Sequence, residues 1–236
     1  MIAGVATAWA QTAGPSLAYS RANTVSVFAA YSGDSSHMLM GTAEDRRLLE
    51  FGVAYGRRLY QNRAVNWQYN AEILPVVLES DPVVHSTVNW TSPAVQTENE
   101  SFVPVGSCKA ATGGWSSTEG GVVYSYTYVN TCSRRWTMGE AMSPVGFQGN
   151  FRPRHKLQPF LIAHGGYMYT TQPIPVADAG SFNFTFDFGA GIELYRTKTR
   201  SVRAEYRFHH ISNHNTANDN PGIDSGLFQV TYSFGR

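Results

Sequence analysis

The stretch Phe182-Asn-Phe-Thr-Phe-Asp-Phe-Gly-Ala-Gly-Ile-Glu-Leu194 alternates strictly between two kinds of side chain. Apolar residues, four of them phenylalanine, occupy the even positions, and the odd positions include Asn183, Thr185, Asp187 and Glu193. A period of two is that of a β-strand, because successive side chains of a strand point to opposite faces. The stretch therefore predicts a strand with one apolar and one polar face.

Seven more segments repeat this alternation. It is sharp at 48–59, 65–77, 200–211 and 224–234, and weaker at 23–31, 141–151 and 157–169. Eight strands of about 9–13 residues are an even number of suitable length for a closed membrane barrel. We therefore expect an all-β fold, an eight-stranded antiparallel transmembrane β-barrel.

The composition agrees with alternating strands. Charged residues make up 15% of the 236 residues, aromatic residues 13%, and the formal net charge is +1. Ordinary soluble domains contain about 25% charged residues, and a near-neutral chain has no basic surface for nucleic acid. The mean hydropathy is −0.26, and no apolar run approaches the roughly 20 residues of a membrane-spanning helix.

Alternation alone does not decide which face points inward, because a soluble barrel hides its apolar face and a membrane barrel exposes it to lipid. The large aromatic side chains of the apolar face would overfill a small lumen. The polar face carries both signs of charge, which can pair inside a narrow lumen: Glu50, Arg58, Glu72, Asp187, Glu193, Arg203, Glu205 and Arg207. We expect the membrane barrel, with a soluble ligand-binding barrel as the alternative.

The connections between the expected strands alternate in length. Short polar links lie at 60–64, 152–156 and 195–199, and longer links at 32–47, 78–140, 170–180 and 212–223. Short turns at one end and long loops at the other are typical of outer-membrane barrels, whose long loops are extracellular. The segment 78–140 is expected to be one long, irregular surface loop with an extra hairpin near 121–128.

The N-terminus and the cysteines indicate export. Ala8-Trp9-Ala10 has the small-x-small form of a signal-peptidase site, so we interpret residues 1–10 as a residual signal peptide and 11–236 as a single domain. A disordered alanine-rich terminus is the alternative. Cys108 and Cys132, the only cysteines, are expected to form a disulfide worth about 3 kcal/mol, rather than remain free thiols.

Three side chains near the C-terminus interrupt the apolar face. His210 and Ser212 continue the apolar parity of one expected strand, and Asp224 has the apolar parity of the next. They are therefore expected to lie together on the outer face at the long-loop rim. An imidazole oriented by a carboxylate can activate a serine hydroxyl as a nucleophile. Asn213, Asn220 and the Gly222 backbone are candidate donors to the oxyanion.

This segment resembles the active-site segment of the PagL-type lipid A 3-O-deacylases. His210-Ile-Ser212-Asn213 is followed by Asn220, eight residues after the serine, and by Asp224, twelve after it. The resemblance implies an outer-membrane esterase that removes an acyl chain from lipopolysaccharide, without a cofactor. It also implies His210 as base, Ser212 as nucleophile, Asp224 as orienting acid and Asn220, with Asn213, near the oxyanion. Two features depart from the family: Asp224 stands where glutamate is common, and the segment 78–140 is unusually long.

Other interpretations of the same residues remain open. His209, His210 and His214 could bind a metal with Asp219 and Asp224, although His209 has the opposite strand parity from His210. His210 and Ser212 could also be polar residues of the membrane interface without chemistry. The chain would then be a non-catalytic barrel whose 78–140 segment binds a surface partner. The sequence does not decide whether it forms a homodimer.

Overall fold

The computed structural model describes residues 19–91 and 94–236. It contains ten strands and one short 3₁₀ helix, η1 (Ala177–Ala179). The strands are β1 (Asn23–Ser32), β2 (Arg47–Gln61), β3 (Val65–Thr91), β4 (Val95–Phe102), β5 (Ala111–Glu119), β6 (Val122–Phe151), β7 (Leu157–Thr170), β8 (Phe182–Tyr195), β9 (Arg200–Ser212) and β10 (Ile223–Gly235). In the described part of the chain, no helix is long and apolar enough to span a membrane.

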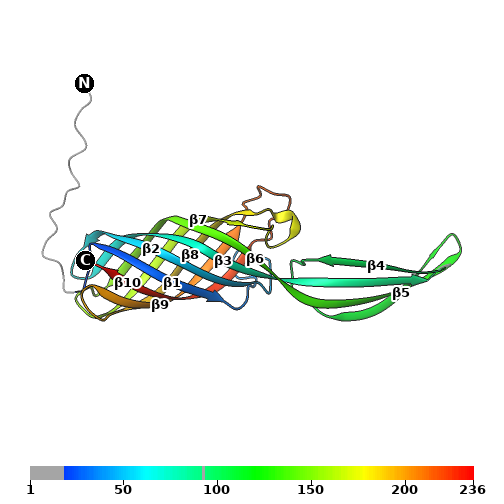
Figure 1. Cartoon of the computed structure of the whole chain (residues 1–236), viewed down its shortest axis with the longest axis horizontal. Helices are drawn as coiled ribbons and strands as arrows, with labels where there is room; N and C mark the ends of the chain where they lie inside the picture. The colour runs from blue at the N-terminus through cyan, green and yellow to red at the C-terminus, as the bar shows by residue number, and fades with distance from the viewer. Residues whose placement is uncertain (1–18, 92–93) are drawn as a thin grey trace, which may run out of the picture.

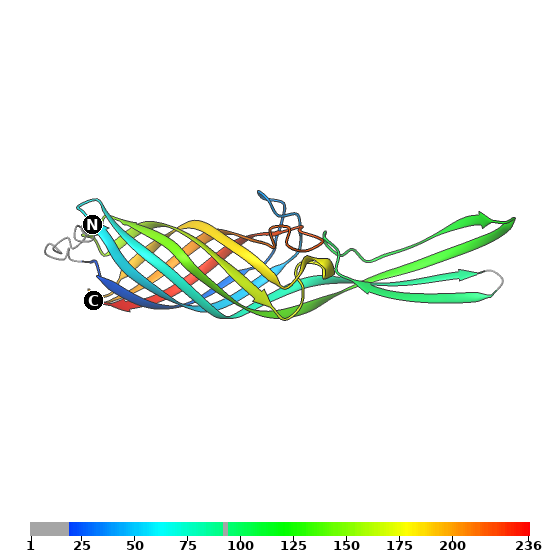
Figure 2. The ribbon, with the colours of Figure 1, turned by 90° about the horizontal axis from the view of Figure 1, so that it is seen from above.

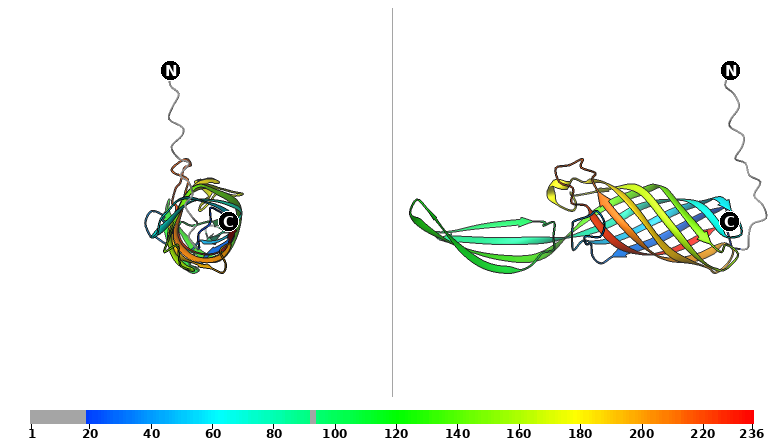
Figure 3. Two further views of the ribbon diagram at one scale, coloured as in Figure 1. Left: turned by 90° about the vertical axis from the view of Figure 1, so that its left-hand side faces the viewer. Right: turned by 180° about the vertical axis from the view of Figure 1, so that it is seen from behind.

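Eight of the strands close into an antiparallel barrel. Their order around the wall is β1-β2-β3-β6-β7-β8-β9-β10, and β1 pairs with β10 to complete the ring. The tilted strands and the closed wall are visible from the side in Figures 1 and 2 and along the axis in Figure 3. The eight-stranded antiparallel barrel expected from the alternation is therefore confirmed, and a closed wall leaves no unpaired edge inside it.

The apolar face of the barrel points outward. In β8 the exposed side chains include Phe182, Phe184 and Phe188, whereas Asn183, Asp187 and Glu193 are buried in the lumen. The same division of faces holds around the ring, where large apolar side chains form the outer surface. A polar interior with an apolar exterior is the arrangement of a membrane barrel, not of a soluble one.

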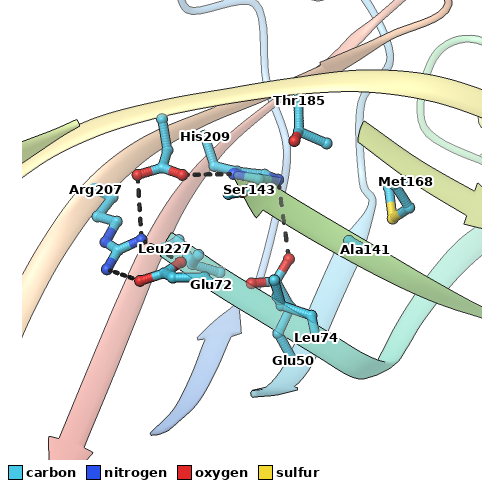
Figure 4. Close-up of a pocket in the computed structure, with 11 residues that line it drawn as sticks. Glu50, Glu72, Leu74, Ala141, Ser143, Met168, Thr185, Arg207, His209 and Leu227 are labelled. Carbon is cyan, nitrogen blue, oxygen red and sulfur yellow. Dashed lines mark hydrogen bonds and ion pairs between the residues drawn. The ribbon is translucent and has the colours of Figure 1, made fainter. Parts of the chain in front are cut away.

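Charged side chains fill the lumen and pair with one another. Arg207 lies 2.9 Å from a Glu72 oxygen, 2.6 Å from Glu205 and 3.2 Å from Asp187. Figure 4 shows Arg207, Glu72, Glu50 and His209 around a cavity of about 10 Å³, room for about one water molecule. Of the charged residues expected in the lumen, all are buried except Arg58, which is half-buried near the short turns.

The connections have the expected lengths, with one difference. Residues 78–140 are not an irregular loop, because β3 and β6 run on beyond the barrel and remain paired from Val77 and Gly139 to Thr91 and Ser125. β4 and β5 pair with their outer edges, which gives the order β4-β3-β6-β5. We call these four strands beyond the barrel the extension. It projects from the end of the barrel opposite the C-terminus (Figures 1 and 2).

A disulfide ties the extension together. Cys108, in the link between β4 and β5, is bonded to Cys132 of β6 with an S–S distance of 2.01 Å. The disulfide expected from the two cysteines is therefore confirmed. The expected hairpin is also present, as the tight turn between Glu119 of β5 and Val122 of β6. The interpretation of residues 1–10 as a residual signal peptide lies outside the described residues.

Candidate active site

His210 and Asp224 are direct cross-strand partners on β9 and β10. His210 Nδ1 lies 2.6 Å from Asp224 Oδ1, within the range of a hydrogen bond to a charged acceptor. On its other side His210 faces Phe186 of β8, with ring centroids 5.2 Å apart. Because Nδ1 is committed to the carboxylate, Nε2 is the ring nitrogen free to accept a proton, as in a serine hydrolase.

The second oxygen of Asp224 is held by the loop between β1 and β2. The backbone amides of Leu39 and Met40 both donate to Asp224 Oδ2, each at 2.7 Å. The carboxylate side chain is fully buried. Its two oxygens therefore have different partners, and the loop fixes the orientation that the carboxylate presents to His210. No pattern in the sequence of 33–46 pointed to this contact, because the two amides are backbone groups about 185 residues from Asp224 in the chain.

Two glycines allow the loops to approach this pair closely. A Cβ on Gly41 would lie 2.6 Å from the Asp224 backbone nitrogen, so any side chain there would displace the loop. Gly222 has a φ of +62°, and a Cβ there would lie 3.2 Å from His210 Cε1. Gly222 also accepts a hydrogen bond from the Ala43 amide at 3.0 Å. The backbone at Gly41 and the backbone at Gly222 are thus packed against each other, and Gly222 also packs against the His210 ring.

Ser212 is the last residue of β9 and lies on the same strand face as His210. It is half-buried and pairs with Phe184 of β8. Among the hydrogen bonds of residues 19–91 and 94–236, none involves the Ser212 hydroxyl, and such bonds often form only when substrate is bound. Ser212 and His210 line one groove of about 460 Å³ together with Met40, Gly166, Phe184, Thr185, Phe186 and His214.

The three candidate oxyanion donors have different surroundings. The side-chain NH₂ of Asn213 donates to the carbonyls of Ala179 and Asp219, so its side chain braces the loop instead of facing the groove. The backbone N–H of Asn213 donates to Asn220 Oδ1 at 3.1 Å. Asn220 Nδ2 has one long contact, 3.4 Å to Asn215 Oδ1. Asn220 therefore has the side chain with the most freedom to donate to a substrate.

The five residues of the metal hypothesis are not gathered at one point. His209 pairs with Asp187 and faces the lumen, on the opposite side of β9 from His210. Within the described residues, the one group with suitable ligand geometry is Glu72, His164 and Asp187 in the lumen. Arg207 Nη1 lies 3.1 Å from His164 Nδ1 in the same group. A guanidinium already neutralises these carboxylates, so the group does not fit a metal ion.

Arg46 joins the loops that surround the site. Its guanidinium is fully buried and donates to the carbonyls of Pro104 (2.6 Å), Val105 (3.0 Å) and Pro175 (3.0 Å). It also pairs with Asp81 of β3 at 3.2 Å. Burial lowers the pKa of Arg46, and the Asp81 carboxylate opposes this shift. Arg46 thus fastens its own loop, which also holds Asp224, to the base of the extension. The polar sequence around it, Glu44-Asp45-Arg46-Arg47, did not indicate this role.

The fold and these contacts define a class: a membrane-spanning β-barrel with a groove on its outer face that is lined by a serine and by a histidine paired with a buried aspartate. A family model described as lipid A 3-O-deacylase (PagL) matches residues 103–233, more than half of the chain. The chain belongs to this family of outer-membrane ester hydrolases. The protein is accordingly an outer-membrane β-barrel.

Solved structures with similar chains were also found. The crystal structure of the outer membrane enzyme PagL is 13% identical, covers 89% of this chain and 99% of its own, and has a TM-score of 0.49. The crystal structure of Neisserial surface protein A (NspA) is 12% identical, covers 91% and 97%, and has a TM-score of 0.45. No curated protein matches the sequence.

Proposed function

We propose that this chain is an esterase that removes an ester-linked acyl chain, the 3-O-hydroxyacyl chain, from lipid A. The observation that carries the proposal is that His210, which lies 2.6 Å from the buried Asp224, lines the same groove as Ser212. Membership in the lipid A 3-O-deacylase family supports the substrate class. The substrate is then lipopolysaccharide, and no cofactor takes part.

Ser212 is the proposed nucleophile and His210 the proposed base. The Ser212 hydroxyl attacks the ester carbonyl while His210 Nε2 accepts its proton, and the carbonyl oxygen becomes an oxyanion. When this intermediate collapses, the C–O bond to the sugar breaks and His210 returns the proton to the leaving sugar oxygen. Water, deprotonated by His210, then attacks the acyl-serine. The C–O bond to Ser212 breaks, His210 returns the proton to the serine oxygen, and the fatty acid is released. Asp224 holds the imidazole in the required tautomer throughout.

The developing oxyanion requires donors close to Ser212. Asn220 is the proposed side-chain donor because its NH₂ is the least committed of the candidates. The Gly222 backbone beside the His210 ring is the second proposed donor. Asn213 is proposed to act indirectly, since its backbone N–H donates to Asn220 Oδ1 and thereby sets the direction of the Asn220 NH₂ group.

The groove also suits the expected substrate. Its walls include Phe184 and Phe186 on the outer, apolar face of β8, and Met40 from the loop between β1 and β2. An acyl chain can lie against these side chains while the ester reaches Ser212. We propose that the groove opens at the extracellular leaflet, because the long loops of an outer-membrane barrel are extracellular. We further propose that residues 11–236 act as one domain.

Mass spectrometry of lipid A tests this function. Purified protein should lower the mass of lipid A by one hydroxyacyl chain, and Ser212→Ala should abolish the change while the barrel remains heat-modifiable on gels. Ser181→Ala is the matched control, since Ser181 is also half-buried and adjoins β8 at the same rim. A Ser212→Ala protein with full activity would exclude the mechanism. If Ser212→Ala retains function whereas deletion of 78–140 abolishes it, the non-catalytic barrel whose 78–140 segment binds a surface partner is favoured instead.

A further inference from the structure

One face of the extension carries five aromatic side chains from three adjacent strands. Trp90 of β3 pairs with Tyr126 of β6, and Trp115 of β5 pairs with the same tyrosine. Tyr124 and Tyr128 lie on either side of Tyr126 along that face of β6. We call these five residues, Trp90, Trp115, Tyr124, Tyr126 and Tyr128, the aromatic platform.

The rings of the platform lie against one another both across and along the strands. The Trp115 and Tyr126 rings are 4.8 Å apart and nearly parallel, at 3°. Tyr124 and Tyr126 are also stacked, at 6.5 Å, and Trp90 lies 6.4 Å from Tyr126. The platform is therefore a continuous aromatic surface and not a scatter of single rings.

This surface is open, although its rings are large. Trp115 is 51% exposed, and Tyr124, Tyr126 and Tyr128 are half-buried only by each other and their neighbours. The opposite face of the same strands carries small polar side chains, among them Thr87, Asn89, Thr97, Thr127 and Thr131. In the described chain no second layer covers the aromatic face. Exposed aromatic patches of this kind mark interaction sites.

The charges nearby restrict the chemistry of the partner. The segment 84–132 contains three glutamates, Glu98, Glu100 and Glu119, and only one lysine or arginine, Lys109. A surface with so few cations does not suit a phosphorylated or otherwise anionic ligand. On the same face as the rings, Gln96 is the cross-strand partner of Trp90, Ser117 is the partner of Tyr124, and Asn130 continues the parity of the three tyrosines. Trp and Tyr rings beside such amide and hydroxyl side chains suit a neutral, hydroxyl-rich ligand, whose C–H faces stack on the rings and whose hydroxyls bond the polar groups.

The position of the platform indicates where such a ligand comes from. β3 and β6 carry it outward from the rim where the His210 groove opens, away from the end that holds the C-terminus (Figures 1 and 2). A glycolipid whose acyl chains occupy the groove would extend its saccharide in this direction. We propose that the aromatic platform binds the neutral saccharide chain of the lipopolysaccharide substrate. That the saccharide belongs to lipopolysaccharide rests on the proposed function. That the ligand is neutral and rich in hydroxyl groups is inferred from the platform itself.

Titration calorimetry with a lipid-free probe tests the platform separately from the esterase. The full chain in detergent is titrated with neutral polysaccharide released from lipopolysaccharide by mild acid, which contains no ester substrate. We expect saturable binding that Ser212→Ala retains, that Trp115→Ala weakens about tenfold, and that Trp115→Phe largely restores. Val129→Ala is the matched control, since Val129 is exposed on the other face of β6.

The outcomes separate the occupants of the platform. No binding by the wild-type chain, or equal binding by Trp115→Ala, overturns the proposal. So does a wild-type dimer that Trp115→Ala dissociates, which would identify a second copy as the occupant. Retention on phosphatidylcholine vesicles that is lost in Trp115→Ala would identify a lipid surface and also overturn it. If Trp115→Ala does not fold, Trp90→Ala on a different strand replaces it. If the wild-type chain binds the polysaccharide but does not deacylate lipid A, only the proposed esterase function is rejected.

Discussion

His210 and Asp224 face each other across β9 and β10, and the distance from Nδ1 to Oδ1 is 2.6 Å. The aspartate therefore reaches the imidazole without the additional methylene group of a glutamate. This is possible because the two residues are direct cross-strand partners, and because the amides of Leu39 and Met40 hold the other carboxylate oxygen at 2.7 Å. The strand pairing and the two backbone amides thus hold the shorter side chain of Asp224 where it reaches His210.

Asp224→Asn should leave the barrel folded and lower the deacylation rate about 10³–10⁴-fold, because an amide does not stabilise the tautomer and imidazolium that the reaction needs. The rate of acyl release from lipid A measures the effect. Asp219→Asn, on the exposed loop between β9 and β10, should retain activity. Equal rates for Asp224→Asn and the wild-type chain would show that Asp224 has no role in orienting His210.

Gly222→Ala should reduce the rate about tenfold, because the new Cβ would lie 3.2 Å from His210 Cε1 and displace the ring or the loop. Gly120→Ala is the control for backbone strain. Gly120 also has a positive φ, of +55°, but a Cβ there would contact nothing within 4 Å. Comparison of the turnover rates of the two variants separates strain from contact with His210. Equal losses in both would contradict the proposed positioning by Gly222.

Arg46→Met should slow deacylation about 10–100-fold while Ser212 and His210 are unchanged, since the loop that supplies the Leu39 and Met40 amides loses its anchor. The loss should appear mainly in kcat, because the groove walls on β8 remain in place. Arg63→Met, in an exposed short turn at the other end of the barrel, is the matched control. Wild-type kcat in Arg46→Met would show that the loop holds Asp224 without this anchor.

Arg207→Met should lower the free energy of unfolding by about 3–5 kcal/mol, because Glu72, Glu205 and Asp187 would lose their shared buried cation. Urea unfolding in micelles, followed by the heat-modifiable gel shift, measures the change. Arg196→Met, exposed in the turn between β8 and β9, should change the stability by less than about 1 kcal/mol. Similar midpoints for both variants would mean that lumen pairing contributes little.

Much of the barrel could be predicted from local pattern. The alternation at 182–194 matches β8, Phe182–Tyr195, within one residue, and the strand at 200–211 matches β9 equally closely. Strand parity also placed His210 on the outer face and His209 on the inner one. These features are local, because a period of two is a property of a single strand.

The extension was predicted less well. The residues of β4 and β5 are mostly polar and exposed, and neither strand buries an apolar face that would produce strong alternation. They are strands because β3 and β6 continue past the barrel and offer paired edges to them. Only Tyr124, Tyr126 and Tyr128 retained a visible period of two, and this is where the hairpin was expected.

The sequence by itself determined the eight strands, the face that each side chain occupies and the candidate residues His210, Ser212 and Asp224. Tertiary structure alone decided that Asp224 is gripped by the amides of Leu39 and Met40, and that Arg46 ties this loop to the extension. The physical reason is the nature of the contacts. Side-chain alternation is a local property of the residues of one strand and can be read from their sequence. Backbone amides and carbonyls are nearly the same in every residue, so their specific partners are decided only when the barrel closes.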